Sequence, residues 1–168
     1  LSLPAELLGA AKATGQLGSF RYGVLTAFED EVSFNATANG QRVRVAQDGS
    51  DYGIARLMYE NNDSGYRAIG LLNTAVQHYD RDAYVTGLDW HLLTKSGKLK
   101  MDGQVFRSDL DGIDAGYGGF VDFEYTFRQG VRQRLGIEYF DDDVNINDLG
   151  FQSRNHYRQI RTAHTRTT

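Results

Sequence analysis

Cysteine is absent from the 168-residue sequence, proline occurs once, and no apolar run is long enough to form a transmembrane helix. Without cysteine the chain forms neither disulfides nor thiolate metal sites, which suits a reducing compartment or a membrane β-barrel that needs neither. A spanning helix requires about 18 consecutive apolar residues, so no helix of this chain is expected to cross a membrane. The formal net charge of −4 leaves no basic surface field, which excludes nucleic acid as an expected partner.

The clearest pattern that is present lies between Gly116 and Asp141. Before a turn at 128–130, one side of the alternation carries Val121, Phe123, Tyr125 and Phe127, and the other side carries Phe120, Asp122, Glu124 and Thr126. After the turn, one side carries Leu135, Ile137 and Tyr139, and the other side carries Arg132, Arg134 and Glu138. Because successive side chains of a strand point to opposite faces, this pattern predicts two amphipathic strands joined by a tight turn. Each exceeds the common strand length of about five or six residues. Long strands with one apolar and one charged face are typical of a membrane β-barrel wall.

Similar patterns predict further strands along the chain. They are expected at 19–29, 52–61, 66–77, 83–94, 99–107 and 156–167, and a small hairpin is expected at 31–47 around Asn39-Gly40. Residues 3–14 fit either a short helix opened by Pro4 or, at Ala10 to Thr14, the end of a strand.

The predicted connections alternate in length. Short turns at 15–18, 62–65, 95–98 and 129–130 alternate with longer links at 30–51, 78–82, 108–114 and 141–155. An up-and-down outer-membrane barrel has short turns on one side and long loops on the other, whereas a Greek-key sandwich has no reason to alternate. The predicted fold is therefore all-β, an antiparallel up-and-down transmembrane β-barrel. Residues 1–168 form one domain, with about eight strands closed or with nine as part of a larger barrel. The sequence begins at Leu1 without Met or a signal peptide, so either a signal was cleaved or the chain is a piece of a longer protein, and we favour the second.

Nine charged residues are predicted to face the lumen of such a barrel. They are Arg56, Arg67, Asp89, His91, Asp122, Glu124, Arg132, Arg134 and Glu138. One interpretation is a selective polar channel or a sugar path, in which charged rings decide which solute passes. The other is a plugged lumen in which opposite charges pair across neighbouring strands, as Asp122 and Glu124 are placed to do with Arg132 and Arg134.

Two other sets of polar residues are candidates for a metal site and for a catalytic site. Asp143, Asn145 and Asn147 resemble the start of a calcium loop, but Asp148 and Arg154 stand where Gly and Glu are required. A solvated loop that positions Phe151 is the expected structure, with no metal and no cofactor. Asp89 beside His91 is a possible acid–base pair, yet no hydrolase or phosphate-binding motif accompanies it, so no enzymatic activity is expected.

Aromatic side chains form a third set. Tyr22, Tyr52, Tyr59, Tyr66, Tyr84, Trp90, Tyr125, Phe127 and Tyr139 lie mostly near predicted strand ends. In a barrel they would form girdles at the two membrane interfaces. A sugar-stacking platform would instead require them to cluster on one exposed face.

Four stretches resemble the C-terminal region of a large bacterial outer-membrane family that is classed as a domain of unknown function. They are Leu8–Glu31, Tyr52–Met58, Ala83–Leu92 and Tyr139–Tyr157, and their most specific parts are Leu8-Gly9-Ala10-Ala11-Lys12 and Asn147-Asp148-Leu149-Gly150-Phe151-Gln152. Members of the family typically carry an N-terminal domain resembling a carbohydrate-binding module, which is absent here, followed by a β-barrel longer than this chain. The resemblance implies an outer-membrane fragment and carries no catalytic residue.

Together these observations predict a bacterial outer-membrane β-barrel protein that acts as a membrane-spanning pore or anchor, linked to carbohydrate binding or uptake. Outer-membrane lipid is the expected partner, and carbohydrate and other subunits of an envelope complex are further candidates. The alternative is a soluble all-β carbohydrate-binding module of the lectin-like kind.

Overall fold

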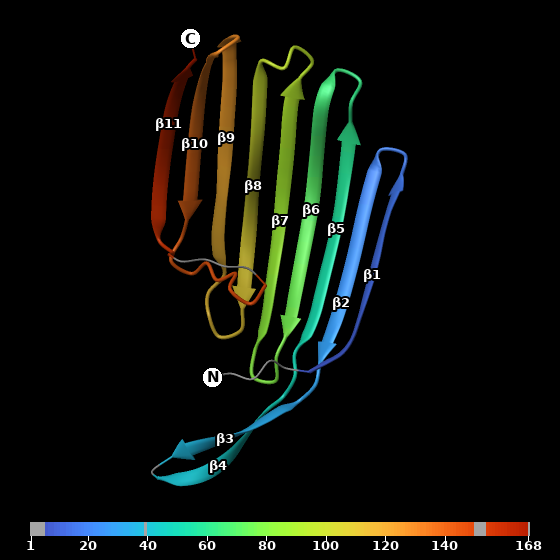
Figure 1. Ribbon diagram of the computed structural model, residues 1–168, viewed down its shortest axis with the longest axis vertical. Helices are drawn as coiled ribbons and strands as arrows, with labels where there is room; N and C mark the ends of the chain where they lie inside the picture. Colours follow the sequence, from blue (N-terminus) through green and yellow to red (C-terminus); the bar gives the residue numbers. More distant parts are fainter. Residues whose placement is uncertain (1–5, 39, 150–153, 168) are drawn as a thin grey trace.

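The computed structural model describes residues 6–38, 40–149 and 154–167, and within them all regular elements are β-strands. No helix in this part of the chain is long and apolar enough to span a bilayer. One antiparallel sheet contains β1 (Leu7–Leu17), β2 (Phe20–Glu29), β5 (Asp51–Asn61), β6 (Gly65–Gln77), β7 (Asp82–Thr94), β8 (Leu99–Leu110), β9 (Gly116–Arg128), β10 (Val131–Phe140) and β11 (Tyr157–Arg166). β3 (Val32–Ala38) and β4 (Gln41–Gln47) form a separate hairpin that projects from one end of the large sheet (Figure 1).

The large sheet is an open meander. Its nine strands follow chain order, and each contacts only its sheet neighbours in the described residues. The prediction of an all-β antiparallel up-and-down sheet is confirmed. The prediction that about eight strands close a ring is wrong for the described chain, because β1 and β11 remain at opposite edges (Figure 1). Closure depends on strand tilt and stagger, which the alternation pattern does not specify.

Short and long connections lie at opposite ends of the sheet, as the sequence predicted (Figure 1). We call these the turn end and the loop end. Gly97 and Gly130 adopt φ values of 67° and 75° in two of the short turns, a backbone conformation that other residues rarely tolerate. The prediction of the first short turn at 15–18 begins too early in the chain, since β1 continues to Leu17. The strand interpretation of Ala10 to Thr14 is confirmed, whereas Pro4, Asn39 and Phe151 lie outside the described residues.

The strand register separates two faces. One row of directly paired residues crosses the sheet from β2 to β11 and consists of Phe20, Tyr59, Ile69, Trp90, Gly103, Val121, Ile137 and Ile160. We call the side that carries this row the apolar face. The other side carries Arg56, Asp89, Asp102, Glu124 and Arg134, and we call it the charged face.

Only a small part of the molecule is a conventional hydrophobic core. Val76, Ala83 and Leu110 are buried together at the loop end of the charged face, with Tyr52 packed against them. The apolar face remains uncovered, and its large side chains are exposed: Leu71 by 49%, Ile69 by 48% and Ile137 by 40%. The described chain therefore leaves its most hydrophobic surface outside its own interior.

Glycines inside the strands make room for long side chains on neighbouring strands. A Cβ on Gly103 would overlap the indole of Trp90 on the apolar face, and a Cβ on Gly118 would overlap the ring of Phe106 on the charged face. A glycine inside a strand often marks such a close approach. These contacts fill the sheet surface without a second layer of structure.

Candidate functional site

The charged face carries ion pairs that cross the sheet from β2 to β11. At one side Arg21 Nη2 lies 2.9 Å from Glu60 Oε1, and Arg56 is bound to Asp89. At the other side Arg161 is bound to Glu138. Glu60 and Asp89 are almost completely buried, with 6% and 9% of their surface exposed, so their negative charges require these cations.

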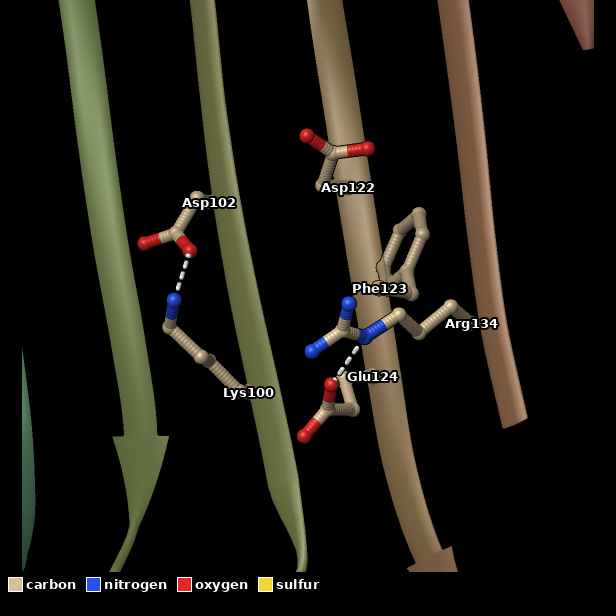
Figure 2. A pocket seen from close by; sticks show the side chains of 6 residues that line it. All are labelled: Lys100, Asp102, Asp122, Phe123, Glu124 and Arg134. Atoms are coloured by element: carbon tan, nitrogen blue, oxygen red, sulfur yellow. Dashed lines mark hydrogen bonds and ion pairs between the residues drawn. The ribbon is translucent and has the colours of Figure 1, made fainter. Parts of the chain in front are cut away.

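A hollow of ≈ 290 Å³ lies between β8, β9 and β10, toward the turn end of the charged face (Figure 2). Lys100 Nζ lies 2.7 Å from Asp102 Oδ2 on one side of the hollow, and Arg134 is bound to Glu124 on the other. Asp122 lies opposite Asp102 and two residues from Glu124 on β9, and it has no ion-pair partner among the described residues (Figure 2). The hollow thus presents one unneutralised carboxylate beside groups of both signs.

Eight of the nine charged residues predicted to share one face do so. They are Arg56, Asp89, His91, Asp122, Glu124, Arg132, Arg134 and Glu138. Arg67 is the exception. It pairs with Asn61 and Leu92 and lies on the apolar face two residues before Ile69, so its assignment to the charged side was wrong. The two-residue alternation of β6 places Arg67 with Ile69 and Leu71, on the face opposite to Ala68 and Gly70.

Asp89 and His91 do not form the isolated acid–base pair considered from the sequence. His91 Nδ1 is hydrogen-bonded to Asp102 Oδ1 at 2.8 Å, while its Nε2 is 4.0 Å from Asp89. Asp89 is already engaged by the guanidinium of Arg56. Arg56 with Asp89 and His91 with Asp102 thus form two hydrogen-bonded pairs, which lie side by side on the charged face because His91 approaches Asp89.

The connection between β10 and β11 folds back over the loop end of the charged face. Val144 is completely buried, and a Cβ on Gly116 of β9 would overlap its backbone. The backbone N–H of Asn145 donates to Ser108 Oγ at 3.1 Å, and Asn155 Nδ2 donates to the carbonyl oxygen of Val144 at 2.6 Å. This segment, residues 141–148, is therefore a packed part of the sheet surface.

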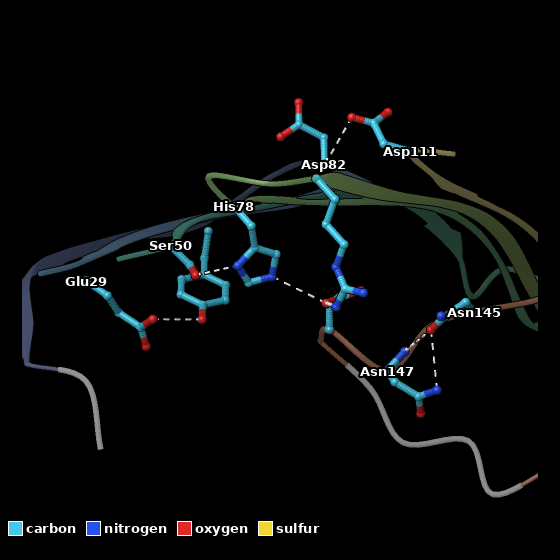
Figure 3. Close-up of polar contacts among 10 residues, drawn as sticks. Glu29, Ser50, His78, Asp82, Asp111, Asn145 and Asn147 are labelled. Carbon is cyan, nitrogen blue, oxygen red and sulfur yellow. Dashed lines mark hydrogen bonds and ion pairs between the residues drawn. The ribbon is translucent and has the colours of Figure 1, made fainter. Parts of the chain in front are cut away.

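A series of polar contacts connects segment 141–148 to the β6–β7 connection, which lies at the same end of the sheet (Figure 3). Asp148 Oδ1 accepts from Arg81 Nη2 at 3.0 Å and lies 3.3 Å from His78 Nε2. His78 Nδ1 in turn lies 2.6 Å from Ser50 Oγ, and Ser50 is only 5% exposed. These contacts join the β10–β11 connection to the β6–β7 connection and the start of β5. Figure 3 shows the sheet curving over them.

Sequence reasoning missed several residues of this arrangement. Lys100 and Asp102 share the alternation that identifies the charged face, so the same pattern predicts them. Ser50, His78 and Asp148 had no such signal, because Asp148 and His78 are separated by 70 positions in the chain and meet only through the fold.

The structure gives no support to a calcium site at Asp143, Asn145 and Asn147. Asn145 Oδ1 accepts hydrogen bonds from the backbone and the side chain of Asn147, so this oxygen is used within the turn (Figure 3). Among the described residues, no three His, Asp or Glu side chains are grouped so as to hold a metal ion. Partial desolvation, followed by the negative charges of Asp142, Asp141 and Asp114, raises the pKa of Asp143.

Aromatic side chains are concentrated at both ends of the apolar face. Phe20, Tyr22, Tyr59, Tyr125 and Phe127 lie toward the turn end, and Phe28, Tyr84, Tyr117 and Tyr139 lie toward the loop end. Leu71, Leu88, Val105, Leu135 and Ile137 occupy the band between them. Two of the predicted aromatic residues, Tyr52 and Tyr66, lie on the charged face instead, and Trp90 lies within the band.

Comparison with known proteins gives one match. The sequence model of the family described as "Domain of unknown function (DUF5916)" matches residues 4–167, which is nearly the whole chain. No curated protein and no solved structure matches significantly.

Proposed function

We propose that this chain, which belongs to the DUF5916 family of unknown function, supplies a membrane-spanning section of a bacterial outer-membrane β-barrel. The observation that carries the proposal is the uncovered apolar face of a single-layer sheet whose opposite face is charged. The barrel would act as a pore or as an anchor. A link to carbohydrate binding or uptake belongs to the same proposal and rests on the family resemblance.

Lipid is the environment that suits the apolar face. Soluble monomers rarely expose contiguous apolar patches larger than a few hundred Å². Here Leu71, Leu88 and Val105 are exposed next to one another on the adjacent strands β6, β7 and β8. Removing one such side chain from water stabilises it by about 1.5–3 kcal/mol, and lipid chains provide this transfer without a second protein layer.

The aromatic side chains also fit the dimensions of a bilayer. Tyr117 and Phe127 mark the two ends of the apolar face on β9 and are ten residues apart. At about 3.4 Å per residue they are separated by roughly 34 Å along the strand, which a strand tilt of about 35–45° reduces to a height of about 24–28 Å. The apolar band of a transmembrane barrel is about 25 Å tall and is bordered by aromatic girdles on both sides. A sugar-binding platform would place its aromatic residues in one cluster, and this difference disfavours a soluble lectin-like module.

The two sheet edges determine what else the barrel requires. β1 and β11 each have one edge without a partner strand in the described chain, and so expose backbone N–H and C=O groups. Hydrocarbon offers no hydrogen-bond partner to such groups. A membrane-embedded form must therefore pair both edges with further strands, which makes this sheet a section of a larger barrel.

The charged face would line the interior of that barrel. Its cations and carboxylates are largely neutralised by one another, so the lining would be hydrated without a strong preference for ions of one sign. The segment 141–148 lies over the loop end of this face and would narrow the passage there.

Two measurements test the proposal. The chain, purified together with the strands that pair its two sheet edges, is expected to float with liposomes and to resist extraction by alkaline carbonate; an assembly that stays in buffer without detergent and fails to float would contradict membrane insertion. Conductance in a planar bilayer then separates a pore from an anchor, because a closed or plugged barrel gives no current. Reduction of that current by added oligosaccharide tests the link to carbohydrate.

A further inference from the structure

We propose that Arg67, together with the β5–β6 turn, binds the phosphate of a phospholipid head group at the turn end of the apolar face. This assignment deepens the proposed function and rests on it, since a lipid head group reaches Arg67 only if the apolar face is embedded in a bilayer.

The position of Arg67 is unusual for a charged residue. It lies on the apolar face, two residues from Ile69, and its neighbours in the register are Asn61 and Leu92. Tyr59 and Ile69 beside it are 41% and 48% exposed. Arg67 thus lies where the apolar band meets the polar turn, which corresponds to the head-group level of a membrane.

Arg67 also lacks the ion pairs that other cations on the sheet make. No carboxylate of the described residues lies within salt-bridge distance of it, whereas Arg107, on the same face at the loop end, is bound to Asp109. Arg158 on this face lies over the ring of Tyr139. The positive charge of Arg67 is therefore available to an external anion.

A surface pocket of ≈ 540 Å³ lies beside Arg67, and this volume accommodates a small ligand group. Tyr59, Asn61, Asp63, Ser64, Arg67 and Ile69 line it. Asp63 and Ser64 come from the turn, Asn61 and Arg67 from the adjoining ends of β5 and β6, and the apolar members from further along the same strands. A ligand that fits both has a phosphate at one end and hydrocarbon at the other.

The chemistry of the lining favours phosphate. A guanidinium presents paired N–H donors that match two phosphate oxygens, and its aliphatic stem lies comfortably against apolar groups. Asn61 and Ser64 offer further donors. Asp63 opposes an anion, but its carboxylate accepts a hydrogen bond from Asn61 Nδ2 at 3.0 Å and is thereby held toward the turn.

Flotation with vesicles of phosphatidylcholine, alone or mixed with phosphatidylglycerol, tests the assignment. The unaltered chain should favour the anionic vesicles, and Arg67→Gln should reduce that preference about fivefold, the effect of removing one cation from a membrane surface. Arg107→Gln is the control for the loss of one positive charge on the same face: it leaves Asp109 unpaired and lowers the general attraction to anionic vesicles, so Arg67→Gln should reduce the preference more than Arg107→Gln does. Asp63→Asn, which keeps the hydrogen bond from Asn61, should strengthen the preference.

The outcomes separate this site from the proposed function. If Arg67→Gln floats with both kinds of vesicle like the unaltered chain, the head-group site is wrong and membrane insertion stands. If no variant floats with any vesicle, both are wrong. If inorganic phosphate abolishes the effect of Arg67 at constant ionic strength, the site takes free phosphate, and the assignment to a lipid is overturned. Native mass spectrometry should detect retained phospholipid that is lost in Arg67→Gln and kept in Arg107→Gln.

Discussion

Arg56 on β5 and Asp89 on β7 form an ion pair across β6, the strand that lies between them, at the position where β6 carries Gly70. A Cβ at Gly70 would overlap the Asp89 carboxylate and would lie 3.0 Å from Arg56 Nη2. The ion pair therefore requires glycine at position 70 of the intervening strand. The arrangement of the charged face thus depends on where glycines stand as well as on which residues are charged.

Replacing Gly70 by alanine tests this dependence. The added methyl group should displace both partners of the pair and lower the free energy of unfolding by about 1–3 kcal/mol, the usual cost of overfilling a packed site. Denaturant unfolding of the chain in detergent micelles measures the effect. The matched control is Gly53→Ala in neighbouring β5, where the nearest heavy atom to a new Cβ is Ala75 Cβ at 3.9 Å. Equal stability of the two variants would contradict the steric role of Gly70.

Gly103→Ala probes the apolar face through the only tryptophan of the sequence. Since a Cβ at Gly103 would overlap the indole of Trp90, the ring must move away from the sheet, and its fluorescence maximum and anisotropy should change. Gly9→Ala is a suitable control, because nothing lies within 4 Å of the position of its new Cβ. An unchanged Trp90 spectrum in Gly103→Ala would mean that the two residues are not in contact.

Asp148→Ala should release the segment 141–148 from the sheet. The substitution removes the acceptor shared by Arg81 and His78, and a hydrogen bond to a charged group contributes about 1.5–3 kcal/mol. Amide hydrogen exchange within 141–148 should accelerate at least several-fold, while exchange in β7 and β8 stays unchanged. If the barrel conducts, its conductance should also rise.

Asp142→Ala is the control for that experiment. Asp142 belongs to the same segment, but its side chain is 74% exposed and its carboxylate only approaches His156 at 4.0 Å. Asp142→Ala should leave amide hydrogen exchange within 141–148 at the rate of the unaltered chain. If the two variants behave alike, the contacts of Asp148 do not hold the segment.

The acidic run at the loop end should make the segment sensitive to pH. The pKa of Asp143 is raised by partial desolvation and by Asp142, Asp141 and Asp114, so the folded state disfavours its ionised form. A raised folded-state pKa gives stability that is present at low pH and lost as pH rises through that pKa. Asp143→Asn should therefore slow proteolysis of the segment at neutral pH and have little effect in acid. A difference that does not vary with pH would contradict this explanation.

Much of the sheet follows from alternation alone. The pattern from Gly116 to Asp141 places Asp122 and Glu124 one strand from Arg132 and Arg134, and Glu124 and Arg134 are direct neighbours in the register. Arg67 is predicted on the charged face, and this prediction is wrong. Its two-residue spacing from Ile69 already places it on the apolar face. Gly70 and Gly103 carry a usable signal too, since a glycine inside a strand often marks a close approach of neighbouring groups.

Other features depend on tertiary structure that no local pattern reports. The contact between His78 and Asp148 joins two connections that are distant in sequence, and it exists only because the chain folds back over the charged face. Likewise, the open edges of β1 and β11 follow from the overall tilt and stagger of the strands, and residue alternation is compatible with either an open or a closed sheet.

The position of Trp90 gives the most direct test of the proposed membrane wall. It lies on the apolar face between Ile69 and Gly103, and no other tryptophan interferes with its fluorescence. As a control, a Trp90→Phe/Asp122→Trp double variant moves the indole to the charged face. In vesicles with brominated acyl chains, Trp90 should be strongly quenched by the lipid and little affected by aqueous iodide, and the double variant should show the reverse. Quenching of Trp90 by iodide but not by brominated lipid would contradict the assignment of the apolar face to the membrane.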